Sequence, residues 1–117
     1  MFARSVLAAA LVAALLGPAQ ADGVAMMSLN SVATDKLPHA DCMTRARAAI
    51  EAAGFSYFDT TTEAVWGQAN DHRDMVSVYC PKSTFIAVFA AGSPTGQGSV
   101  TEPLVNRLIA AWRKLNH

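Results

Sequence analysis

Two cysteines carry the most definite chemistry in this sequence of 117 residues. Cys42 and Cys80 are too far apart for the CxxC spacing of a thioredoxin-type redox site, and two thiols without a second pair make a poor zinc site. In an oxidising compartment an isolated pair of cysteines usually forms a structural disulfide. We therefore predict a Cys42–Cys80 bridge, with two free buried thiols, or a redox or metal role, as the alternatives.

Methionine and histidine offer a second chemistry, because thioether and imidazole groups are ligands that copper prefers. The candidate ligands are Met26, Met27, His39 and His72. Met26 and Met27 are adjacent, so a strand would direct them to opposite faces, and no two histidines have the spacing of one helix face. Ordinary core and turn residues are the simpler interpretation. A periplasmic copper-type metal-binding protein remains the alternative function.

No catalytic set is recognisable. The sequence has no GxSxG motif, and four carboxylates that could serve as acid or base show no pairing: Asp59, Glu63, Asp71 and Asp74. The glycine-rich stretch 91–98 precedes an expected helix, which is a generic anion site. It lacks the GxxxxGK[ST] spacing, however, and no Lys or Arg lies between Lys82 and Arg107. We expect a flexible connector there, no cofactor, and no enzyme with a preformed active site.

Aromatic side chains on the expected strands suggest a surface for a partner. Tyr57, Trp66 and Tyr79 lie in segments of strand character, and the sheet face away from the helices has no further layer to cover it. The three residues are therefore predicted to form an exposed patch that binds a protein or envelope component, or that makes a homodimer through the open sheet face. Packing at an edge strand is the alternative.

The elements that must position these residues follow from hydrophobic periodicity. Residues 38–53 are predicted to be a helix that ends at Gly54, with an apolar stripe made of Cys42, Ala46, Ala49, Ile50 and Ala53. A capping box at residues 99–102 opens a second helix, whose stripe is Leu104, Val105, Leu108, Ile109, Trp112 and Leu115. Strands are predicted at 55–59, 64–69, 75–80 and 84–90. Alternation in the third of these places Val76, Val78 and Cys80 on one face.

The N-terminal residues 1–21 are expected to be a cleaved signal peptide. A single cation, Arg4, precedes an apolar run, and Ala19-Gln20-Ala21 has the small-x-small pattern of a cleavage site. The run is too short to span a bilayer. Its removal leaves acidic residues in excess of basic ones by one, which argues against nucleic-acid binding and against a polybasic membrane-surface protein. The expected location is the bacterial periplasm or the outside, without stable membrane insertion.

These elements predict one α+β domain over residues 38–117, preceded by residues 22–37 as a loose N-terminal segment or a short strand. We expect a two-layer sandwich, with two amphipathic helices on one face of an antiparallel sheet of about four strands. A Cys in the first helix, a Gly54-Phe55 exit, a strand ending in Cys80, the apolar strand 86–92 and a C-terminal amphipathic helix resemble small secreted or periplasmic bacterial α+β proteins. That resemblance implies a fold and a compartment but no activity.

Overall fold

The structure is a computed structural model that describes residues 26–94 and 98–115. Five strands and two helices follow one another in the order β1, α2, β2, β3, β4, β5, α3. The strands are β1 (Met26–Ala33), β2 (Ser56–Thr60), β3 (Ala64–Ala69), β4 (Asp74–Tyr79) and β5 (Ile86–Ser93). The helices are α2 (His39–Ala52) and α3 (Gly98–Lys114). The predicted signal peptide, residues 1–21, lies outside the described residues.

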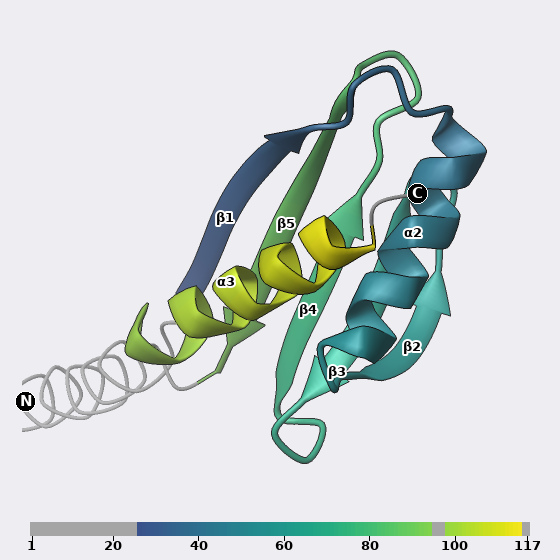
Figure 1. Cartoon of the computed structure of the whole chain (residues 1–117). Coiled ribbons are helices and arrows are strands. Elements are labelled where there is room, and N and C mark those ends of the chain that lie inside the picture. Colours follow the sequence, from purple (N-terminus) through teal and green to yellow (C-terminus); the bar gives the residue numbers. More distant parts are fainter. Residues whose placement is uncertain (1–25, 95–97, 116–117) are drawn as a thin grey trace, which may run out of the picture.

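All five strands form one antiparallel sheet in the order β1-β5-β4-β3-β2. Both helices pack on the same face of this sheet, α3 across β1 and β5 and α2 over β2, β3 and β4 (Figure 1). The α+β class and the arrangement of two helices on an antiparallel sheet are therefore confirmed. The sheet has five strands where about four were expected, because residues 26–33 of the N-terminal segment form a strand.

The core lies between the helices and the covered face of the sheet. Strand alternation directs Val76, Val78, Ala87, Phe89 and Ala91 toward the helices, and all five are almost fully buried. The predicted stripe of α3 meets them, with the Trp112 and Phe89 rings edge to face at 5.4 Å between centroids. The Arg45 guanidinium of α2 donates to the Trp112 carbonyl oxygen at 2.6 Å, which joins the two helices near the end of α3.

The predicted disulfide is present and joins the two layers. Cys42 on α2 is bonded to Cys80, the residue after β4, with their Cα atoms 6.1 Å apart. Both residues are buried in the core. Because the bridge closes a loop with a sequence separation of 38, it restricts the unfolded chain and so stabilises the fold. A disulfide fits an oxidising compartment.

Two strands differ from their predicted extents. β1 has eight residues and pairs with β5 along its whole length, although its sequence shows only weak alternation. Its partner β5 continues to Ser93, so part of the stretch expected as a flexible connector is strand. Long-range pairing with β5 orders both segments, and local sequence patterns carry no information about that pairing.

Removing the disulfide tests how much it contributes to the free energy of unfolding. The double variant Cys42→Ala/Cys80→Ala should lose about 4 kcal/mol of unfolding free energy, because its unfolded chain regains the entropy of the open loop. Chemical denaturation of the variant and of oxidised and reduced wild type would measure this. Reduced wild type should match the variant. Equal midpoints for oxidised and reduced protein would contradict the assignment.

Gly67 offers a second test of the packing between α2 and the sheet. A Cβ atom at this position would lie 2.6 Å from Cγ2 of Ile50 and 3.2 Å from the backbone oxygen of Ser56. Gly67→Ala should therefore destabilise the protein by about 1–3 kcal/mol through overpacking. Gly98→Ala is the matched control, since nothing lies within 4 Å of its Cβ position. Equal unfolding midpoints for the two variants would contradict the close approach.

Candidate functional site

The face of the sheet that carries no helix is apolar and hollowed. A shallow hollow of about 310 Å³ lies over β1, β5, β4 and β3. Side chains alternate along each strand, so every second residue faces the hollow. Together with Gly92, the lining consists mainly of Met27, Leu29, Ala64, Trp66, Met75, Ser77, Tyr79, Val88 and Ala90. None of these residues is charged. The hollow therefore suits apolar groups and offers no charge to attract a phosphate.

The strand register explains why this face is concave. Across the middle of the sheet Leu29 pairs with Ala90, Ala90 with Ser77 and Ser77 with Trp66. The next row toward the β3–β4 turn runs from Met27 through Gly92 to Met75. Small residues on the inner strands thus form a floor between large side chains on either side. This combination of a small floor and large walls is typical of a surface that accepts side chains from a partner.

Large side chains on the walls are well exposed. Met27 and Leu29 are 65% and 64% exposed, and Trp66 and Tyr79 are 36% and 40% exposed. Single exposed apolar residues are ordinary, but a contiguous group of this size on one face is not. Ile86, on the same face of β5, extends the apolar surface beyond the hollow.

Tyr79 is held in place by a carboxylate at the edge of the hollow. Its hydroxyl donates to Oε2 of Glu63 at 2.8 Å, and the backbone N–H of Lys82 donates to Oε1 at 3.2 Å. The hydrogen bond from Tyr79, and then that from Lys82, lowers the pKa of Glu63 below its ordinary value. The same contact raises the pKa of Tyr79. A phenol anchored in this way presents its ring to the hollow with little freedom left to lose on binding.

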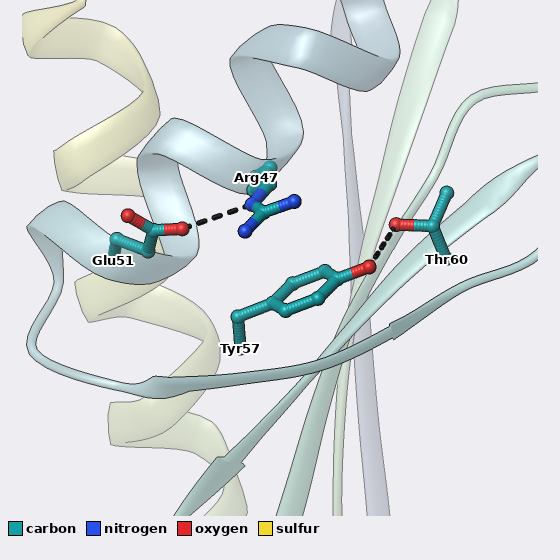
Figure 2. A network of polar contacts seen from close by, with 4 residues as sticks. All are labelled: Arg47, Glu51, Tyr57 and Thr60. Atoms are coloured by element: carbon teal, nitrogen blue, oxygen red, sulfur yellow. Dashed lines mark hydrogen bonds and ion pairs between the residues drawn. The ribbon is translucent and has the colours of Figure 1, made fainter.

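Tyr57 does not belong to this surface, which corrects the predicted trio. Its cross-strand partner is Gly67, and a Cβ at Gly67 would point at Ile50 of α2, so Tyr57 faces the helix side. There its ring lies under the Arg47 guanidinium, 3.9 Å from ring centroid to Cζ. Figure 2 shows this arrangement, with Arg47 also paired to Glu51 and the Tyr57 hydroxyl hydrogen-bonded to Thr60. Alternation shows which residues of one strand share a face, but it does not show which face of the sheet that is. For this reason Tyr57 was predicted on the wrong face.

The proposed copper ligands are not brought together. Met26 and Met27 begin β1 and face opposite sides of the sheet, and His39 follows the far end of that strand as the first residue of α2. His72 lies in the β3–β4 turn, with its Nδ1 atom 2.7 Å from Oε1 of Gln68. Within the described ranges no group of three or more His, Cys, Asp or Glu side chains could hold a metal ion.

Asp74, one of the four carboxylates considered as a possible acid or base, lies where the β3–β4 turn enters β4. Asn70, Asp71 and His72 have φ angles of 52°, 58° and 68°, and the chain then returns into β4 at Asp74, which is fully buried. Asn70 Nδ2 donates to Asp74 Oδ2 at 2.7 Å, and the Ser93 hydroxyl of β5 is a further donor. Asp74 therefore fastens the turn to β5, which is a structural role.

The environment of Asp74 sets a pH dependence. Burial alone would raise the pKa of its carboxyl, but hydrogen bonds from Asn70 and Ser93 and the charge of Arg73 outweigh burial and lower it. A carboxyl whose folded pKa is depressed stabilises the fold above its unfolded value and loses that contribution as pH falls through the folded value.

Asp74→Asn should accordingly cost about 1–3 kcal/mol at neutral pH, because it replaces a charge-assisted acceptor. The difference from wild type should shrink over the acidic range in which the pH falls below the ordinary pKa of an aspartate, about 3.9, and through the lowered pKa of folded Asp74. Denaturant unfolding across this range measures it. Asp71→Asn, exposed in the same turn, is the control and should stay within about 0.5 kcal/mol of wild type. A constant gap between Asp74→Asn and wild type over the whole pH range would contradict the assignment.

No helix among the described residues is both long enough and apolar enough to cross a membrane. Comparison with protein-family models gives no match, and comparisons with curated proteins and with solved structures give none either. The candidate site is therefore defined by its own residues and geometry.

Proposed function

We propose that the protein is a small, non-catalytic binding module of the bacterial periplasm or extracellular space, and that its open sheet face takes a protein partner. The observation that carries this proposal is the apolar hollow between Leu29 and Trp66, with its floor of small residues. A surface of this kind is costly to leave in water and matches the buried centre of a protein–protein interface.

The chemistry of the hollow defines the partner. Its lining carries no charge, so a nucleic acid or a strongly charged polymer would gain nothing there. Trp66 and the anchored Tyr79 are large, partly exposed and amphipathic, which are the features of side chains that dominate binding energy. A partner that inserts one or two aliphatic or aromatic side chains between them fits the surface best.

The polar groups of the hollow support a binding role over a catalytic one. They are the Ser77 hydroxyl, which is nearly buried, and the Tyr79 hydroxyl, which is already committed to Glu63. Neither lies beside a histidine or a second carboxylate in the lining, and nucleophilic or acid–base catalysis needs such a pair. The signal-like pattern expected for residues 1–21 and the disulfide support the proposed compartment.

Site-specific photocrosslinking tests this function. A photoreactive amino acid at position 66 should form an adduct with a partner in intact cells, whereas the same group at exposed position 113 on α3 should not. The captured protein is then purified, and its affinity for wild type, Trp66→Ala and Arg113→Ala is measured by calorimetry. We expect Trp66→Ala to weaken binding by about 2 kcal/mol or more and Arg113→Ala to leave it unchanged.

Three outcomes would overturn the proposal: equal adducts at positions 66 and 113, an adduct at position 66 that contains lipid or glycan and no protein, or equal affinities for Trp66→Ala and wild type. Unfolding midpoints of the two variants should agree closely, which separates lost binding from lost folding.

A further inference from the structure

The free edge of β1 presents backbone groups to which no strand among the described residues is paired. β1 ends the sheet order, so one of its sides faces no described strand. The Ser31 N–H is bonded to the side-chain Oδ1 of Asn30 at 2.8 Å, whereas the Thr34 N–H is bonded to the Phe85 carbonyl at 2.9 Å. The backbone N–H and C=O groups of the even-numbered residues of β1 therefore point toward β5. Those of Met27, Leu29 and Ser31 point away from β5, to the free edge of the sheet.

The two edges of the sheet differ in how they are protected. β2, at the other edge, has five residues, a register shift between Tyr57 and Asp59, and a carboxylate on Asp59 that accepts the Thr60 N–H. Short length, irregularity and charge are the usual means of keeping an edge strand from pairing. β1 has eight residues, a regular register with β5 and no charged side chain. It is therefore a template for a further strand. Its Ser31 N–H is bonded to the exposed side chain of Asn30, which must turn away when another strand pairs there.

We propose that the occupant of this edge is a second copy of the chain, whose β1 pairs antiparallel with the first about a two-fold axis at Leu29. In this register each Leu29 exchanges two backbone hydrogen bonds with its counterpart, and Met27 lies opposite the partner's Ser31. A strand without charges is complementary to itself, because no like charges meet across the axis. Each Leu29 side chain, 64% exposed in one chain, packs against its equivalent.

The surroundings of β1 leave room for this pairing. Ser28, Leu29 and Asn30 line a shallow hollow of about 270 Å³ together with Glu102, Val105 and Asn106 of α3. The side chains on one face of a paired β1 from the second copy would lie over this hollow. Part of the interface is therefore formed between that β1 and α3 of the first copy. The incoming strand thus makes backbone hydrogen bonds along the edge of β1, and its side chains contact Leu29 on one face and the hollow beside α3 on the other.

Pairing about this axis has a consequence for the open face. The axis is perpendicular to the sheet, so the helices of both copies lie on one side and both apolar hollows on the other. Ten strands then form one continuous sheet. This assembly leaves most of each open face uncovered, so it differs from a dimer formed face to face. Leu29 belongs to both the dimer contact and the wall of the hollow, whereas Trp66 belongs to the hollow alone.

Charge exchange at position 29 tests the register. Wild type should show twice the mass of one chain by light scattering at high concentration and dissociate on dilution. Leu29→Lys and Leu29→Glu should each be monomeric, because like charges meet at the axis. An equimolar mixture of the two should recover the dimer as a heterodimer. Ile86→Lys and Ile86→Glu, at an exposed position of the same face on β5, are the matched controls and should remain dimeric separately.

Amide exchange in the unmodified protein supplies a second readout. The Leu29 N–H should exchange about tenfold more slowly in concentrated than in dilute protein, because pairing alone protects it. Amides near Phe58 on the other edge should not change.

A wild type that is monomeric at all concentrations would overturn the inference. A dimer that Trp66→Ala dissociates while the mixed Leu29 variants show no recovery would also overturn it, and would assign the contact to the open face. Loss of partner binding in Trp66→Ala with the dimer intact bears only on the proposed function.

Discussion

Side chains of a strand alternate between the two faces of its sheet, and the helices among the described residues cover one face only. The covered face takes Val76, Val78 and Phe89 and forms the core with α2 and α3. The alternate positions of the same strands remain large and apolar, with Met27, Leu29 and Trp66 among them. A two-layer fold with a monomeric role would be expected to carry polar residues there. The composition of the uncovered face is the feature that the functional proposal explains.

The disulfide and the buried Asp74 act on opposite ends of the sheet. Cys42–Cys80 links α2 to the end of β4, whereas Asp74, the first residue of β4, joins the β3–β4 turn to Ser93 at the end of β5. Between them the inner strands are held in one register, and that register aligns Ala90 with Ser77 and Gly92 with Met75. The small floor of the hollow depends on this alignment, since a shift by one residue would exchange the two faces of a strand.

Local patterns in the sequence were sufficient for the elements that carry strong periodicity. Both helices, the face assignment of β4 and the disulfide could be predicted, because amphipathic stripes and an isolated cysteine pair are local or compositional signals. Sequence could not place Tyr57, because the relative parity of β2 and β3 depends on a bulge between Tyr57 and Asp59. It also missed Met27, Leu29 and Met75 as wall residues and Asp74 as a buried carboxylate. Those roles arise from pairing between distant strands, for which a single sequence gives no signal.

The most direct measurement of the central claim is solvent access at methyl groups in solution. Paramagnetic relaxation of the purified protein by a soluble gadolinium chelate reports which methyl groups a small solute can approach. If the sheet face is uncovered, the methyl groups of Met27, Leu29 and Met75 should relax strongly in protein dilute enough to be monomeric, while those of Leu108 and Val78 beneath the helices should not. Addition of the captured partner should protect the first group alone. The account would be contradicted if the methyl groups of Met27 and Leu29 in the free, monomeric protein were as well shielded as those of Leu108.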